Sequence, residues 1–145
     1  MDKTEIILNK YFGFGSFRGL QETIIKRTTE ERKHSLVLMP TGSGKSLCYQ
    51  IPALYFENKT IVISPLIALM QDQVDALRKK NVPAAFINST LSKQERGKRL
   101  EDFLNGNIKI LYVTPERFRK KDFIEKIKTV KIDLLAVDEA HCISE

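Results

Sequence analysis

Short apolar segments alternate with helical patterns along this chain of 145 residues. Each segment is nearly continuous in apolar character, which is typical of strands that are buried on both faces of a sheet. Because strand, helix and strand follow one another repeatedly, the sequence predicts a mostly parallel sheet with helices on both faces. The expected strands are Ser35–Met39, Thr60–Ser64, Ala84–Ile87, Ile108–Val113 and Leu134–Asp138.

Two of the segments between the expected strands carry helix signals, one after Ser64 and the other after Ile87. In the second of these segments, Ser92 and Glu95 form a capping-box pattern and Asn105-Gly106 is a suitable helix end. Pro52 lies inside a further helix, expected after Lys45, and predicts a kink there because proline lacks a backbone donor. The apolar stripes at three- and four-residue spacing are Leu66, Met70, Val74 and Leu77 in the first helix, and Leu100, Phe103 and Leu104 in the second.

The segment between the first expected strand and this Pro52 helix has the pattern of a phosphate-binding loop. Gly42 and Gly44 let the backbone approach a phosphate without a Cβ clash, and the helix start adds N–H donors and its dipole. Lys45 is expected to reach the β and γ phosphates of a nucleoside triphosphate, and the Ser46 hydroxyl to bind Mg²⁺. Met39 stands where the full pattern has glycine, a relaxed form typical of helicases. The expected phosphate-binding residues are Met39, Pro40, Thr41, Gly42, Ser43, Gly44, Lys45 and Ser46.

A second motif, Asp138-Glu139-Ala140-His141, follows the last expected strand, whose Leu134–Val137 segment is predicted to be buried. Asp138 at the strand end is expected to hold Mg²⁺ through water, and Glu139 to position and deprotonate the attacking water. His141 has two interpretations: a hydrogen-bonded histidine at a strand end, or a relay between the triphosphate site and a nucleic-acid site.

Composition narrows the class of protein. The formal net charge is +6, which favours polyanionic partners. Basic clusters at 78–80, 93–99 and 117–121 can equally be solvated helix faces. Cys48 and Cys142 fit no metal-ligand spacing, so we expect reduced thiols and no zinc. Neither a membrane-length apolar run nor a signal-peptide pattern occurs, and we expect an intracellular protein without membrane contact.

With both motifs in order, the chain resembles the first RecA-like domain of superfamily 2 helicases, and within them the RecQ family of DNA helicases. The resemblance covers essentially all 145 residues. It implies an α/β, three-layer P-loop domain with a mostly parallel central sheet that stops soon after the DEAH motif. Residues 1–33 are expected to form a helical adenine-recognition region, and residues 34–145 the P-loop core.

Residues 12–21 resemble the adenine-recognition motif of this family. The resemblance implies that Phe14 stacks on adenine, Gln21 reads its edge and Arg18 contacts the nucleotide. The family often has Tyr at Phe14 and Pro-Gly at Gly19-Leu20, so the ring hydroxyl is lost and the local turn can differ. The alternative is that the phenylalanines pack in the core of an N-terminal helix; these are Phe12, Phe14 and Phe17.

Three further segments resemble the motifs with which these helicases contact one nucleic-acid strand. Such segments place hydroxyls, helix N-termini and backbone N–H groups against phosphates. The residues that carry this expectation are Pro65, Leu66, Gln71, Asn88, Ser89, Thr90, Thr114, Pro115, Glu116 and Arg117.

The resemblance implies an ATP- and Mg²⁺-dependent enzyme that translocates 3′ to 5′ on single-stranded DNA and unwinds DNA, including duplex junctions, in recombination and repair. It implies a second RecA-like domain in the same parent protein, which supplies an arginine finger and which residues 1–145 lack. These residues alone are therefore expected to bind nucleotide and DNA weakly and not to unwind. The expected location is the cytoplasm in a bacterium and the nucleus in a eukaryote. Two alternatives stay open: an RNA helicase of the DEAD or DEAH type, and a nucleotide-binding module without hydrolysis.

Overall fold

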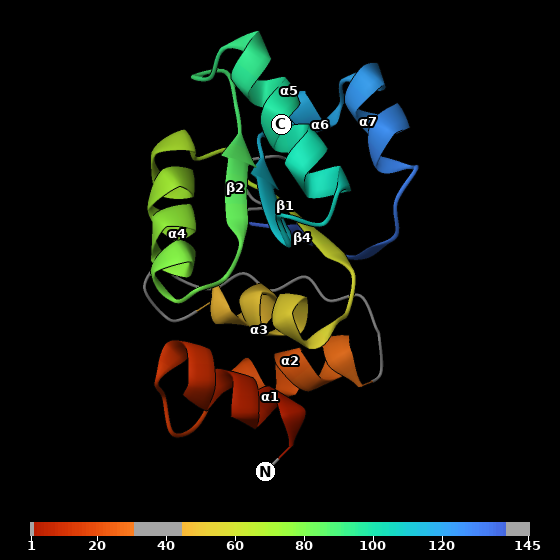
Figure 1. Cartoon of the computed structure of the whole chain (residues 1–145). Coiled ribbons are helices and arrows are strands. Elements are labelled where there is room, and N and C mark those ends of the chain that lie inside the picture. The colour runs from red at the N-terminus through yellow and green to blue at the C-terminus, as the bar shows by residue number, and fades with distance from the viewer. Residues whose placement is uncertain (1, 31–44, 139–145) are drawn as a thin grey trace. The chain divides into compact units, whose positions relative to one another are not determined.

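The computed structural model describes residues 2–30 and 45–138 of the chain (Figure 1). The chain divides into two compact units, Met1–Glu57 and Asn58–Glu145. The expected strand Ser35–Met39, the loop residues 39–44, and Glu139 and His141 lie outside the described residues, as does the predicted boundary at residue 33. Within the described part, no helix is long and apolar enough to cross a membrane.

The first unit is helical. It contains α1 (Lys3–Ile7), a π-helical turn η1 (Leu8–Phe12), α2 (Gln21–Thr29) and α3 (Leu47–Tyr55). Asp2 caps α1, because its Oδ1 accepts hydrogen bonds from the Glu5 N–H at 3.0 Å and the Thr4 hydroxyl at 2.6 Å. The Asp2 carboxylate also pairs with Lys26 of α2 at 3.4 Å, which ties α1 to α2.

The core of this unit is built where α1, α2 and α3 meet. α3 continues through the buried Pro52, and the Phe56 N–H donates to the Pro52 carbonyl at 3.0 Å. The kink expected at Pro52 stays a prediction. The buried apolar side chains of the unit are Ile7, Leu8, Phe12, Ile24, Ile25, Leu47, Tyr49, Ile51, Ala53 and Phe56.

The second unit is built on a parallel sheet, which confirms the predicted fold class. Its strands are β1 (Lys59–Ile63), β2 (Ala84–Ile87), β3 (Ile110–Val113) and β4 (Ile132–Val137), in the order β2-β3-β1-β4. All three pairings are parallel. Hence β1, the first of these strands in the chain, lies between the two last ones.

The helices of the second unit are α4 (Ile67–Lys79), α5 (Lys93–Leu104), α6 (Pro115–Phe118) and α7 (Lys121–Ile127). The capping pattern is confirmed, since Ser92 precedes α5 and its hydroxyl accepts from the Glu95 N–H at 3.1 Å. Gly106, just beyond α5, has a positive φ of 88°, which suits the predicted helix end. Most residues of the predicted apolar stripes are buried: Met70, Val74, Leu77, Leu100 and Phe103.

The two faces of the sheet have different covers, as Figure 1 shows. On one face, Leu111 and Val113 of β3 pack with Leu100 and Phe103 of α5 and with Phe123 of α7. Alternate residues of a strand point to the opposite face. There the Tyr112 hydroxyl donates to Gln73 Oε1 of α4 at 3.0 Å.

The prediction that Leu134–Val137 is buried is wrong for part of β4. Leu135 is 50% exposed and Val137 is 45% exposed. They lie in register with Ile61 and Ile63, and so share the face that α5 and α7 cover over the other strands. Since β4 is the end strand of the described sheet, that helical layer leaves its outer residues open.

Candidate functional site

Four segments that carry predicted site residues leave the sheet at the same edge. Because the strands are parallel and Ile63, Ile87, Val113 and Val137 lie in matching register, the residue after each strand falls at one level. Ligands of parallel α/β sheets bind at this carboxyl edge. In the order of the strands, the segments begin at Asn88, Thr114, Ser64 and Asp138.

Asn88 is the scaffold of the loop after β2. Its side chain is only 1% exposed, and its Oδ1 accepts from the Thr90 N–H at 2.9 Å and the Thr90 hydroxyl at 2.5 Å. Its Nδ2 lies 3.5 Å from the Met70 sulfur, within donating distance. Three residues are predicted to contact a strand here. Ser89 and Thr90 are exposed, whereas Asn88 is buried and holds the loop beneath them.

The loops after β1 and β3 lie beside this one. The Ser64 hydroxyl accepts from the Leu66 N–H at 3.3 Å, and the Ser64 N–H donates to the Val113 carbonyl at 3.0 Å, so the two loops are joined at their base. Thr114 is 2% exposed and precedes α6, whose first residue is Pro115. The remaining predicted residues are more open: Glu116 and Gln71 are exposed, and Pro65, Leu66, Pro115 and Arg117 are half-buried.

Asp138 takes its position from β1. Its N–H donates to the Ile63 carbonyl at 2.8 Å, which extends the pairing of β1 and β4 by one residue, and Asp138 is half-buried. The next residues of the motif, Glu139 and His141, fall outside the described ranges.

The predicted adenine-recognition residues belong to the first unit. Phe14 is 54% exposed, whereas Phe12 is 9% exposed and Phe17 is half-buried, so the core-packing alternative describes Phe12 and not Phe14. Gln21 is 2% exposed. Its Oε1 accepts from the Arg18 N–H at 2.8 Å, and its own N–H donates to the Arg18 carbonyl at 3.1 Å.

This reciprocal pair closes a turn from Arg18 to Gln21 just before α2, whose N-cap residue is Leu20. Gln21 thus closes the turn that carries Arg18, whose side chain is exposed. Nothing in the residue pattern of 12–21 distinguishes this bracing role from a contact with the base.

Lys45 and Ser46 introduce α3. The Ser46 carbonyl accepts from the Gln50 N–H and the Lys45 carbonyl from the Cys48 N–H, both at 2.9 Å. Lys45 and Ser46 are half-buried at the helix start, where backbone N–H groups favour an anion. Met39, Pro40, Thr41, Gly42, Ser43 and Gly44 are not among the described residues.

The chemistry of Ser46 and Asp138 fits Mg²⁺, which prefers hydroxyl, carboxylate and water oxygens. They belong to different units, so their joint placement with Lys45 stays a prediction. Within the described ranges, no three His, Cys, Asp or Glu side chains gather as a metal site of their own.

Two positions that the sequence pattern did not single out support the site. Tyr112 and Gln73 connect β3 to α4. Gln73 follows Met70 by three residues in α4, and the Met70 sulfur contacts Asn88. Their contact was not predicted, because it depends on which faces of β3 and α4 meet in the fold.

Comparison with known proteins places the chain among helicases. The sequence profile of the DEAD/DEAH box helicases matches residues 18–145. The chain is 50% identical over 145 residues to the ATP-dependent DNA helicase RecQ of Bacillus subtilis, covering all of this chain and 24% of that protein. It is 48% identical over 139 residues to the protein of the same name from Pasteurella multocida, covering 96% of this chain and 22% of the relative.

A mammalian relative is similar to a comparable extent. The bifunctional 3′-5′ exonuclease/ATP-dependent helicase WRN of mouse is 45% identical over 140 residues, which are 95% of this chain and 10% of that protein. The resemblance to RecQ helicases read from the motifs is confirmed. The chain spans about a quarter or less of the length of these relatives.

Proposed function

We propose, from the premise that this chain belongs to the DEAD/DEAH box helicase family, that it is the ATP-binding part of a DNA helicase of RecQ type. The observation that carries the proposal is the common edge of the sheet. There the three predicted strand-contacting loops lie side by side, and Asp138 follows at the neighbouring end of β4. A helicase motor needs this proximity, because nucleic-acid contact must change the state of the hydrolysis site.

The proposed roles follow from the residue chemistry. Lys45 neutralises the β and γ phosphates, and the loop of residues 39–46 holds them by backbone N–H groups. Ser46 and Asp138 hold Mg²⁺, which offsets phosphate charge when it is bound. Glu139 orients the attacking water and accepts its proton, and His141 relays to the nucleic-acid side.

The base is held by the first unit. We propose that the exposed Phe14 ring stacks on adenine and that the Arg18 side chain contacts the nucleotide. Gln21 reads the adenine edge, and its Oε1, which accepts from the Arg18 N–H, has a second lone pair for the base.

The whole parent protein is proposed to translocate 3′ to 5′ on single-stranded DNA and to act in recombination and repair, in the bacterial cytoplasm or the eukaryotic nucleus. A second RecA-like domain supplies the arginine finger. Residues 1–145 alone are proposed to bind ATP and DNA weakly and not to separate strands.

The test is ATP hydrolysis by the full-length natural protein, with and without single-stranded DNA or RNA. We expect DNA to raise the rate, and Lys45→Ala and Glu139→Gln to abolish it. As a control, replacing the exposed Lys79 at the end of α4 by alanine should leave the rate unchanged. Stimulation by RNA alone assigns the chain to an RNA helicase. Nucleotide binding without stimulated turnover assigns it to a non-hydrolysing module.

A further inference from the structure

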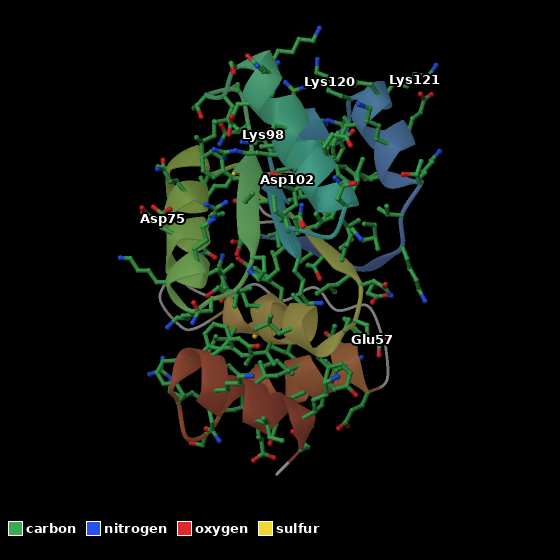
Figure 2. All side chains as sticks on the ribbon, in the orientation of Figure 1. Glu57, Asp75, Lys98, Asp102, Lys120 and Lys121 are labelled. Carbon is green, nitrogen blue, oxygen red and sulfur yellow. The ribbon has the colours of Figure 1, made fainter. Side chains whose placement is uncertain are left out.

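Two basic segments far apart in the sequence meet at one end of the second unit. Residues 91–99 follow β2 and open α5, and residues 114–122 follow β3 and open α7. β2 and β3 pair side by side with Ile87 opposite Val113, so both segments leave the same edge. α5 and α7 then pack on one face of the sheet through a shared core. In Figure 2, Lys120 and Lys121 lie at the end of the unit where α5 begins.

Two of these cationic side chains, Arg96 and Arg99, form hydrogen bonds and an ion pair within the fold. Arg96 Nη1 donates to the Leu91 carbonyl at 2.7 Å. Arg99 pairs with Glu95 at 3.1 Å and donates to the Phe86 carbonyl at 2.9 Å. The lysines differ, because Lys93, Lys98, Lys120 and Lys121 are exposed and form no ion pair with any described residue.

The charge of this end is strongly positive. The two segments hold eight lysines and arginines against three carboxylates, which are Glu95, Glu116 and Asp122. Glu95 is already paired with Arg99. A polyanion that approaches this end therefore meets several exposed ammonium groups with few competing acids.

The surroundings favour nucleic acid over an acidic polypeptide. Protein interfaces are anchored by buried aromatic and aliphatic side chains, whereas nucleic-acid interfaces are polar and positive. Among described residues, neither basic segment contains an exposed large hydrophobic side chain, although Leu69 of α4 and Val137 of β4 are exposed at the same edge of the sheet. The basic end also adjoins residues 88–90 and includes residues 114–117, both of which are predicted to contact a strand.

We infer that Lys98, Lys120 and Lys121 bind backbone phosphates of single-stranded DNA beyond the residues that the helicase motifs predict. Lys98 projects from α5, and Lys120 and Lys121 precede and begin α7, so they extend the interface outward from the ends of β2 and β3. A lysine offers a flexible point charge without a fixed hydrogen-bond geometry. The contacts therefore add affinity and do not select a base sequence. The inference rests on the proposed function, because it presumes a strand on the neighbouring loops.

The opposite edge of the sheet offers a matched control. Lys79 at the end of α4, and Lys128 and Lys131 after α7, are equally exposed but lie in the segments that lead into β2 and β4. Replacing either trio by alanine removes the same charge from the protein. A difference between the two variants therefore measures position and not net charge.

The experiment measures the dissociation constant for a poly-dT oligonucleotide over a series of salt concentrations, using the full-length natural protein. For the triple variant Lys98→Ala, Lys120→Ala and Lys121→Ala, we expect affinity at low salt to fall about tenfold. The slope of log affinity against log salt concentration should decrease in magnitude by about 2, since each phosphate contact on a single strand contributes about 0.7. The control trio should change affinity less than about twofold with the slope unchanged. Arginine at the three tested positions should restore the slope.

Three results overturn the inference. They are equal losses in the two trios, an unchanged slope in the tested trio, or a loss of polyglutamate binding with unchanged DNA affinity; the last points to an acidic protein partner. If the wild-type protein does not bind poly-dT at all, the DNA part of the proposed function fails together with the inference. If the wild-type protein binds poly-dT and the tested trio binds it equally well, only the inference fails and the proposed function stands.

Discussion

Arg78 and Arg99 reach the outer edge of β2 from two different helices. Arg78 Nε of α4 donates to the Ala84 carbonyl at 2.7 Å, and Arg99 Nη1 of α5 donates to the Phe86 carbonyl at 2.9 Å. The Arg99 guanidinium also lies 4.7 Å from the centre of the Phe86 ring. β2 pairs only with β3 in the described sheet, so its outward carbonyls would otherwise be open to another strand. Charged side chains at such an edge oppose pairing between molecules.

This arrangement predicts a double effect of Arg99→Ala. The loss of a charged hydrogen bond and a cation–π contact should lower the free energy of unfolding by about 2 kcal/mol. The uncovered edge should also promote self-association. Urea denaturation and light scattering over a concentration series measure the two effects, with Lys98→Ala as the neighbouring control. Unchanged scattering in Arg78→Ala with Arg99→Ala would show that the edge is protected by other means.

A pair of substitutions at Gln21 separates its two roles. Glu at this position keeps an acceptor for the Arg18 N–H, whereas Leu leaves that donor unpaired. We expect Gln21→Leu to lose about 1–2 kcal/mol. Because Gln21 is 2% exposed, a charged carboxylate there is costly, and Gln21→Glu should retain stability only at a pH low enough to keep it protonated. Since neither variant has the amide, both should lose the preference for ATP over GTP. If Gln21→Glu discriminates the two nucleotides as the wild type does, Gln21 only braces the turn.

Thr60 offers a stabilising substitution. It is 0% exposed in the centre of the sheet, and its hydroxyl has no hydrogen-bond partner among the described residues. Thr60→Val replaces the hydroxyl by a methyl of similar size and should raise the free energy of unfolding by about 1 kcal/mol. Thr60→Ser, which keeps the hydroxyl and removes the methyl, should lower it by about 1 kcal/mol. Thermal denaturation of both variants decides the point, and a destabilised Val variant would reveal a partner for the hydroxyl.

Cys48 should react slowly with alkylating reagents. Burial disfavours its thiolate and raises the pKa of the thiol to about 11. The reactive form is then about 0.1% of the total at pH 8, and its fraction should rise about tenfold for each pH unit up to about pH 10. Iodoacetamide labelling followed by mass spectrometry, in a Cys142→Ser background, measures the rate. Rapid labelling at pH 7 in the folded protein would contradict the raised pKa of the half-buried Cys48, and urea-unfolded protein is the positive control.

Features that depend on short-range patterns could be predicted from the sequence. The stripe of Met70, Val74 and Leu77 packs as its spacing predicts, and Ser92 caps α5 as its pairing with Glu95 predicts. Strand composition identified the parallel sheet, because β-branched runs between helices have few other arrangements.

Other features were not predictable from one sequence, some because they depend on contacts between distant segments and some because the local pattern allows more than one geometry. Leu135 and Val137 have the composition of buried residues, but the order of the strands leaves β4 beyond the helical cover. The bond between the Gln21 side chain and Arg18, and the burial of Asn88 beneath Thr90, follow from local geometry that other residue types also allow. The phosphate-loop residues 39–44 and Glu139 and His141 stay predictions.

The order β2-β3-β1-β4 has a consequence for how the chain is made. β1 is synthesised first among these strands, yet Thr60 pairs with Ile110 and Ile63 with Val137, far along the chain. This central strand must therefore wait for its described partners until most of this sequence has left the ribosome. Such late, long-range pairing slows folding and leaves apolar strands open to aggregation in the nascent chain. During this interval, the residues that later form the centre of the sheet expose their apolar side chains to water.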